Sequence, residues 1–137
     1  MTTMEDYFMH LTEKRLASFH NWPYQEGCSC TPDKMAEAGF FHCPTEQEPD
    51  AVKCFVCGKE LDGWEPDDDP WKEHKSHSPS CPFLNYDKPV EKLPVEDFLH
   101  LTVAIQKIYA TKTYDNMVKE AKESGAETRK EMEKLAK

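Results

Sequence analysis

The pattern of apolar and polar residues changes near Pro94. All ten prolines and four of the five glycines come before Val95, and residues that break helices at this density favour short elements joined by turns. From Val95 to Lys137 the chain has no proline and is rich in Lys, Glu and Ala, which is typical of a long helix. The pattern therefore predicts a small folded domain followed by one long helix.

Apolar residues in the C-terminal segment recur at intervals of three and four, as on one face of a helix. They form two runs that are out of phase through 110–114: Phe98, Leu101, Ile105 and Ile108, then Val118, Ala121, Gly125, Met132 and Leu135. This predicts either two helical faces joined by a register shift or one helix that meets different partners along its length. Because the chain offers no second long helix for packing, the spacing favours intermolecular contacts. The alternative is an isolated, solvated helix.

The residues before Pro94 predict a mixture of short helices and short strands, which is an α+β domain. Apolar spacing predicts a helix over 11–22, and capping residues predict two more, one opened by Thr31-Pro32 and one by Asp69-Pro70. Gly39 is expected to close the helix that Thr31-Pro32 opens. Three segments are short enough to be strands: 40–42, 52–55 and 61–64.

The composition indicates that this domain needs a covalent or metal staple. Of 137 residues, 38% are hydrophobic and 31% charged, which leaves little material for a large core. Residues 1–10 are acidic and lack the apolar run of a secretory signal, and the sequence has no apolar stretch of the roughly 18 residues that a membrane span requires. We expect a protein of the cytoplasm and nucleus, where cysteines are thiols or metal ligands.

The charge is concentrated in the N-terminal part of the chain. Residues 1–95 carry 18 acidic and 9 basic side chains, whereas residues 96–137 carry 8 of each. An acidic domain repels a nucleic-acid backbone and attracts a basic peptide. We therefore expect no direct binding to nucleic acid.

Four residues between 54 and 81 have the spacing of a zinc site. Cys54 and Cys57 form a C-x-x-C pair and Cys81 supplies a third thiolate, with either His74 or His77 as the fourth ligand on spacing alone. Three thiolates and one imidazole close the zinc tetrahedron, so we expect one structural Zn²⁺ and no zinc-dependent enzyme. The remaining cysteines have no histidine at ligand spacing and are expected to be ordinary thiols: Cys28, Cys30 and Cys43.

The residues around this site resemble the baculovirus inhibitor-of-apoptosis repeat. The matching segments are 50–57, 61–74 and 79–83, with Arg15, Phe19, Trp22-Pro23 and 36–40 upstream. The resemblance implies a three-stranded antiparallel sheet surrounded by short helices, and it implies His74 as the imidazole ligand. We then expect four parts in order: an N-terminal segment at 1–14, the zinc-binding domain at 15–86, a linker at 87–97 and the helix at 98–137.

Trp64 stands among carboxylates in the sequence, beside Asp62, Glu65 and the run 67–69. An aromatic wall next to carboxylates suits a small apolar N-terminal residue with a charged amine. The alternative is that Trp64 belongs to the core and the acidic run is a solvated loop.

The resemblance implies that this region binds a histone tail that begins Ala-Arg-Thr and is phosphorylated on the threonine. Trp64 would hold the alanine methyl group and Asp68 the terminal amine. Asp62 with Glu48 would bind the arginine region, and Lys59 with His77 would bind the phosphate.

One repeat followed by a long charged helix also implies an assembly. Members of the family built in this way form a three-helix bundle with borealin and the inner centromere protein, which carries Aurora B kinase. The resemblance thus implies a non-enzymatic role in chromosome segregation and cytokinesis, at the centromere and kinetochore in early mitosis and at the spindle midzone and midbody later. The residues expected to face these partners are Leu101, Ile105, Ile108, Val118 and Ala121.

The same resemblance implies a homodimer when the protein is not in its complex. The expected interface residues are Val95, Phe98 and Leu99, with Tyr7 as an N-terminal candidate. Because Phe98 cannot be buried twice, the dimer and the complex are expected to compete for this segment.

Two further functions follow from the family. It implies inhibition of apoptosis, and direct binding to caspases is the alternative function, with other inhibitor-of-apoptosis proteins as additional partners. Thr31-Pro32 is a candidate for proline-directed phosphorylation as well as a helix cap, and the two roles are compatible because a phosphate is tolerated at a helix N-terminus.

Overall fold

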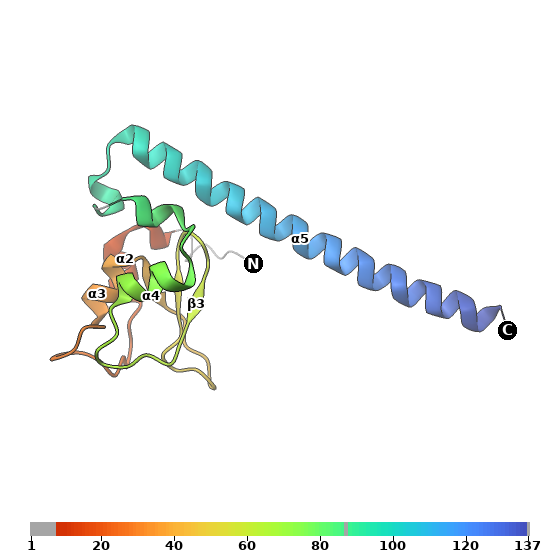
Figure 1. Ribbon diagram of the computed structural model, residues 1–137, viewed down its shortest axis with the longest axis horizontal. Helices are drawn as coiled ribbons and strands as arrows, with labels where there is room; N and C mark the ends of the chain where they lie inside the picture. Colours follow the sequence, from red (N-terminus) through yellow and green to blue (C-terminus); the bar gives the residue numbers. More distant parts are fainter. Residues whose placement is uncertain (1–7, 87, 137) are drawn as a thin grey trace. The chain divides into compact units, whose positions relative to one another are not determined.

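The computed structural model describes residues 8–86 and 88–136 (Figure 1). The chain divides into two compact units, one that extends to Ala104 and one that begins at Ile105. The described helices are η1 (Phe8–His10), α2 (Thr12–Ala17), α3 (Pro32–Glu37), α4 (Pro70–His77), η2 (Pro82–Asn85), η3 (Val90–Lys92) and α5 (Val95–Leu135). Together with the sheet of the first unit, they confirm the predicted α+β class with a long C-terminal helix.

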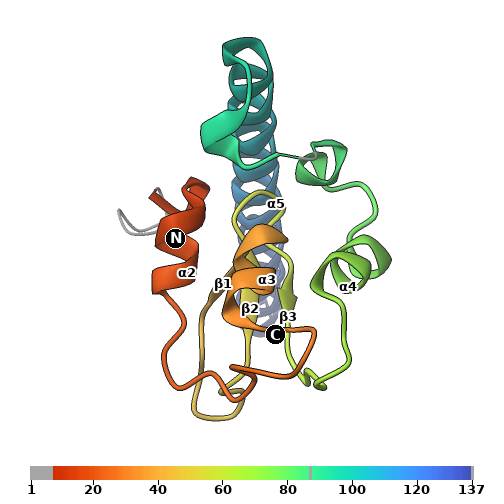
Figure 2. The ribbon, with the colours of Figure 1, turned by 90° about the vertical axis from the view of Figure 1, so that its left-hand side faces the viewer.

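Three short strands form an antiparallel sheet in the order β1-β2-β3: β1 (Phe40–His42), β2 (Val52–Cys54) and β3 (Glu60–Leu61). Figure 2 shows α2 on the β1 side of the sheet and α4 on the β3 side. The third strand is shorter than the predicted segment 61–64. The chain leaves the sheet before Trp64, because Gly63 adopts a φ of 69° and turns the backbone.

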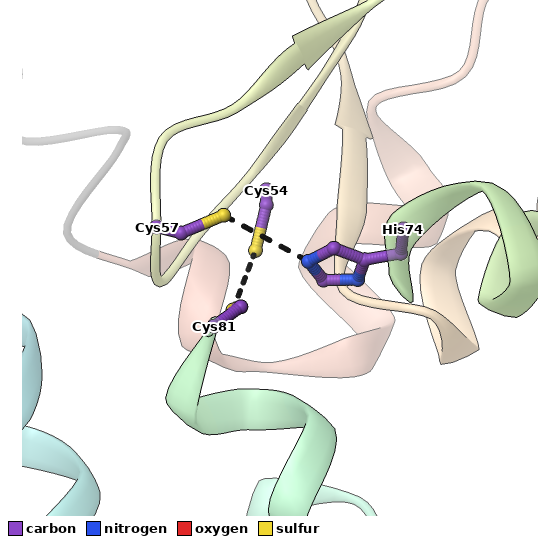
Figure 3. A group of neighbouring side chains, drawn as sticks. All are labelled: Cys54, Cys57, His74 and Cys81. Atoms are coloured by element: carbon purple, nitrogen blue, oxygen red, sulfur yellow. Dashed lines mark hydrogen bonds between the residues drawn. The ribbon is translucent and has the colours of Figure 1, made fainter. Parts of the chain in front are cut away.

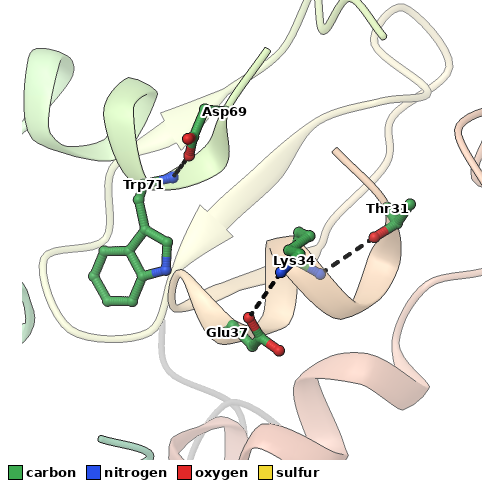
Figure 4. A network of polar contacts seen from close by, with 5 residues as sticks. All are labelled: Thr31, Lys34, Glu37, Asp69 and Trp71. Carbon is green, nitrogen blue, oxygen red and sulfur yellow. Dashed lines mark hydrogen bonds and ion pairs between the residues drawn. The ribbon is translucent and has the colours of Figure 1, made fainter. Parts of the chain in front are cut away.

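Helices α3 and α4 begin at the predicted caps. The Lys34 amide donates to Thr31 Oγ1 at 3.5 Å, and the Trp71 amide donates to Asp69 Oδ1 at 3.0 Å (Figure 4). A proline occupies the first helical turn in both cases. These caps bind backbone N–H groups that have no partner inside the helix.

Helix α2 is much shorter than the predicted span of 11–22. It ends at Ala17, where Ser18 turns its hydroxyl onto the Arg15 carbonyl oxygen. The aromatic residues beyond it leave the helix, and the ring of Phe19 stacks on that of His42 at 5.4 Å and 7°. Tertiary packing of this ring outweighs the helical spacing seen in the sequence.

The core of the first unit is assembled around β1, β2 and a fully buried arginine. Arg15 donates from Nε to the Ala36 carbonyl oxygen at 2.9 Å. Its guanidinium lies 4.4 Å from the centre of the Phe55 ring. Burial lowers the pKa of Arg15 to about 10, which still leaves the side chain charged at neutral pH. A buried cation is thus stabilised by carbonyl oxygens and an aromatic face.

The C-terminal segment forms one continuous helix, α5, and it begins at Val95 instead of residue 98. The change of apolar register therefore occurs without a break in the helix. Within residues 8–86 and 88–136, none of the helices combines the length and apolar character needed to cross a bilayer.

Candidate zinc centre and peptide-binding surface

The four predicted zinc ligands are brought together from separate parts of the first unit (Figure 3). Cys54 ends β2 and Cys57 follows in the turn that Gly58 completes with a φ of 72°. His74 lies in the middle of α4, and Cys81 directly precedes η2. The metal would therefore connect the sheet to the helical segment that follows it.

The donor atoms of these residues have the spacing of a tetrahedral zinc site. All four lie within 4.8 Å of one another. The Sγ atoms of Cys54 and Cys81 are 3.9 Å apart, and Cys57 Sγ is 3.8 Å from His74 Nε2. A tetrahedron with zinc–sulfur arms of about 2.3 Å has edges of about 3.8 Å, so the cluster matches one structural zinc ion.

The imidazole of His74 is oriented by a backbone contact. Its Nδ1 lies 2.8 Å from the Ala38 carbonyl oxygen, a partner that can only accept, so Nδ1 carries the proton. This leaves the lone pair of Nε2 directed at the thiols, as a metal-binding histidine requires. The structure therefore places His74, and not His77, in the zinc cluster.

The thiols of the cluster differ in how readily they lose a proton. Burial raises the pKa of Cys54 well above its ordinary value. The pKa of Cys57 is lowered strongly by hydrogen bonds, first from Cys54 and then from Cys81. One thiolate is thus stabilised by protonated neighbours, and a divalent ion would replace those protons.

The other cysteines are not metal ligands among the described residues. Cys30 is fully buried, and its thiol donates to the Glu65 carbonyl oxygen at 3.2 Å. Burial raises the pKa of Cys30 to about 11, so it stays a protonated thiol at neutral pH. Cys28 and Cys43 are half-buried thiols.

Trp64 is only 5% exposed, and its ring packs edge-on against Phe40 at 5.9 Å. In the part of the chain that the structure describes, its Nε1 is the one buried side-chain polar atom with no hydrogen-bond partner. The indole thus has the burial of a core residue, and a peptide would meet only the small edge that stays exposed.

The acidic side chains near Trp64 separate into two groups. Glu48 and Asp62 are exposed and lie close enough to interact, and the pKa of Glu48 is raised, mainly by the charge of Asp62. Asp68 instead accepts from the Glu65 amide at 2.8 Å and shapes its own loop. The structure therefore pairs Glu48 with Asp62 and gives Asp68 a local role.

The two predicted phosphate contacts are both exposed. His77 Nε2 lies 3.3 Å from Glu73 Oε2, one turn earlier on α4. The carbonyl oxygen of Lys59 accepts from the Cys54 amide at 3.0 Å, which anchors Lys59 beside β3 while its side chain remains in solvent.

The predicted interface residues differ in exposure. Val95, Phe98 and Leu99 are exposed, whereas Tyr7 lies outside the described residues. Leu101 differs from the expectation of a partner contact: it is 2% exposed and is buried within the first unit. The first turns of α5 belong to that unit, and their inward face is used for its own packing. The other expected partner residues are exposed or half-exposed: Ile105, Ile108, Val118 and Ala121.

Sequence analysis did not identify two residues that hold Trp64. The Tyr24 hydroxyl donates to the Trp64 carbonyl oxygen, and Asp50 Oδ2 accepts from the Trp64 amide at 2.8 Å. The first contact spans 40 positions and the second spans 14. No spacing rule connects residues so far apart; the only signal was that Asp50 opens one of the family-like segments.

Comparison with known proteins gives consistent matches. The family profile described as "BIR: Inhibitor of Apoptosis domain" matches residues 15–85. The mouse protein "Baculoviral IAP repeat-containing protein 5" is 51% identical over 93% of this chain and 91% of its own length. The Xenopus laevis protein "Baculoviral IAP repeat-containing protein 5.2-A" is 46% identical over 96% of this chain and 83% of its own length. A solved structure titled "Crystal structure of DIAP1 BIR1 bound to a Grim peptide" aligns over 54% of this chain and 70% of its own, with 35% identity and a TM-score of 0.47.

Proposed function

Because this chain belongs to the Inhibitor of Apoptosis domain family and resembles survivin along most of its length, we propose that it is a non-enzymatic reader of a phosphorylated histone tail. In this proposal the first unit binds the tail and α5 joins the chain to borealin and the inner centromere protein. That complex places Aurora B kinase at centromeres.

The observation that carries the peptide-binding role is the edge of the sheet at β3. Among the described residues β3 pairs only with β2, so its other edge is available to an extended peptide. Asp62, the partner of Glu48, directly follows β3, and Trp64 comes two residues later. An exposed carboxylate pair is costly unless a cation covers it, and an arginine guanidinium is suited to that role.

At α4, the phosphate would take the place of the carboxylate that now contacts His77. His77 already has a carboxylate partner in Glu73 at 3.3 Å, and this contact supports an anionic oxygen as a partner of the imidazole. A phosphate carries more charge than one carboxylate. The phosphorylated tail would therefore displace Glu73 from His77, with Lys59 as the second cation.

Calorimetry with a peptide that begins Ala-Arg-phosphothreonine tests this proposal. We expect the phosphorylated peptide to bind more tightly than the plain one, and acetylation of its N-terminus to abolish binding because the amine loses its charge. In His77→Ala the advantage of the phosphate should shrink by about tenfold, the value of one charge-assisted hydrogen bond. His100→Ala, a change of an exposed histidine on α5, serves as the control. Equal loss on both peptides would exclude a phosphate role for His77.

The partner-binding role of α5 rests on its exposed apolar residues. Tyr114, Met117, Met132 and Leu135 are large and exposed on the second unit, and a helix with such residues gains from burial against other helices. We expect Ile105→Asp with Val118→Asp to abolish co-purification with borealin and the inner centromere protein. The matched pair Gln106→Asp with Lys119→Asp should retain it, and unchanged co-purification in the first pair would contradict the assignment.

The exposed residues Val95, Phe98 and Leu99 would support a homodimer in the absence of those partners. Because they open α5, a dimer and the three-helix bundle would compete for the same part of the helix.

A further inference from the structure

The backbone of Trp64 is held by side chains from two distant segments. On one side the Tyr24 hydroxyl donates to its carbonyl oxygen at 2.5 Å, and on the other Asp50 Oδ2 accepts from its amide at 2.8 Å. Neither bond belongs to the sheet, since β3 ends at Leu61. The position of Trp64 therefore depends on side-chain contacts and not on strand pairing.

Tyr24 belongs to a segment that lies along the loop after Trp64. Three consecutive carbonyl oxygens of that loop, those of residues 64, 65 and 66, accept hydrogen bonds from this segment. The donors are the Tyr24 hydroxyl, the Cys30 thiol and the Ser29 amide. We call residues 24–30 the brace, because they fix the loop along its length.

The brace is itself anchored in the core. Trp22, two positions before Tyr24, is buried and donates from Nε1 to the Cys30 carbonyl oxygen at 2.9 Å. The Tyr24 ring packs edge-on against Trp22 at 6.0 Å. Both ends of the brace therefore contact the Trp22 indole, and these contacts fix the position of the Tyr24 hydroxyl.

The Trp64 loop needs this support because its own backbone is permissive. Gly63 precedes Trp64 with a φ of 69°, and a Cβ atom added there would meet nothing within 4 Å. A glycine in an open turn does not restrict the chain that follows it. The Trp64 ring contacts Phe40, whose ring lies 4.7 Å from that of His74 in the zinc cluster. The indole is therefore packed on the core, whereas the Trp64 backbone is held by Tyr24 and Asp50.

We infer that Tyr24 is a positioning residue of the peptide site: its hydroxyl, opposite Asp50, sets the place of the Trp64 wall. The inference rests on the proposed function and deepens it. Groups held in place by their neighbours lose less entropy when a ligand binds. Because the hydrogen bonds of the brace reach residues 64–66, and not the predicted phosphate contacts His77 and Lys59, we expect its effect to be independent of the phosphate.

The electrostatic surroundings favour a donor at this place. Loss of hydration raises the pKa of Tyr24, and the negative charge that Cys30 gains only at alkaline pH and the charge of Asp50 raise it further. The hydroxyl therefore keeps its proton and remains a donor to the Trp64 carbonyl oxygen.

The test compares Tyr24→Phe with the parent chain by two measurements. Calorimetry should show that the Ala-Arg-phosphothreonine peptide and its plain form each bind about two- to tenfold more weakly, by the same factor, as expected for one lost hydrogen bond. In the peptide-free protein, the NMR signal of the Trp64 indole N–H should shift, whereas a purely global loss of stability would leave it in place. Tyr86→Phe is the matched control, because it removes the same hydroxyl at a position outside residues 24–30 and the Trp64 loop.

Asp50 supplies a second pair of variants. Asp50→Asn keeps an oxygen acceptor for the Trp64 amide and should bind the plain peptide nearly as well as the parent, whereas Asp50→Ala should lose affinity. Equal loss in both variants would show that charge, and not position, is involved and would overturn the inference.

The outcomes separate this inference from the function on which it rests. Unchanged affinity in Tyr24→Phe, or a loss limited to the phosphorylated peptide, overturns the positioning role while the reader function stands. If the parent chain binds neither peptide, the reader function fails. An unshifted Trp64 signal in Tyr24→Phe would then also refute the positioning of Trp64 by Tyr24.

Discussion

At the scale of single residues, the least favourable arrangement on the surface is the contact between Glu48 and Asp62. The two negatively charged carboxylates repel each other there, and Glu60 and Asp50 add further negative charge. The pKa of Glu48 is raised, first by the charge of Asp62. Such a repulsion is expected where the residues serve binding, because residues that bind a ligand often lower the stability of the free protein.

Glu48→Gln should make the protein more stable at pH 7, because the repulsion from Asp62 disappears. The folded state holds the Glu48 proton more tightly than the unfolded state, so the parent chain recovers this stability as pH falls through the raised pKa of Glu48. The advantage of the variant should therefore vanish at low pH. Urea unfolding between pH 7.5 and pH 4 measures it, with Glu46→Gln as the control.

The same variant should bind the tail peptide more weakly, since the arginine loses a carboxylate. A variant that gained stability and kept full affinity would separate Glu48 from the peptide site.

At the scale of elements, the junction between α3 and β1 leaves no room for a side chain at Gly39. Gly39 ends α3 with a φ of 95°, and its carbonyl oxygen accepts from the Phe55 amide at 3.1 Å. A Cβ atom there would come within 3.0 Å of the Phe83 ring. That ring packs on Trp71, stacked at 5.6 Å, and on Phe55, edge-on at 5.0 Å, so a shift of the ring would disturb both contacts.

Gly39→Ala should destabilise the first unit by about 3 kcal/mol, from left-handed backbone strain and overpacking together. Gly63→Ala is the matched control: its φ is similarly positive, but no atom lies within 4 Å of the added Cβ. The control should lose only about 1 kcal/mol. Chemical unfolding of both variants measures the difference, and equal losses would show that the Phe83 ring yields.

At the scale of the whole molecule, the zinc cluster lies entirely in the first unit. Its residues span 54–81, and the second unit begins at Ile105. A bound zinc ion would hold β2, α4 and the segment before η2 together, in a domain whose strands are only two or three residues long. A structural zinc ion in so small a domain contributes much of its folding free energy.

Removal of zinc by a strong chelator should abolish the near-ultraviolet circular dichroism of the first unit, because its tryptophans lose their fixed environment. The helical far-ultraviolet signal should fall by a smaller fraction, since residues 105–135 of α5 hold no zinc ligand.

Metal analysis should find one zinc ion per chain in Cys28→Ser and none in Cys57→Ser. One ion retained in Cys57→Ser would contradict the assigned ligands.

The sequence by itself determined the features that depend on neighbours along the chain. Caps at Thr31 and Asp69, the turn at Gly39 and the C-x-x-C pair at Cys54 are set within a few positions, so spacing rules identify them. The long proline-free segment likewise predicted α5. Family resemblance then supplied the three-stranded sheet and the choice of His74.

Only the tertiary structure decided the features that depend on contacts across the fold. Helix α2 ends early because Phe19 stacks on His42, and Leu101 is buried because the first turns of α5 pack within the first unit. The Trp64 carbonyl oxygen accepts a hydrogen bond from Tyr24, 40 positions away. Local spacing is encoded in short segments, whereas such contacts form only when the whole core closes, because each depends on residues that the chain brings together from distant positions.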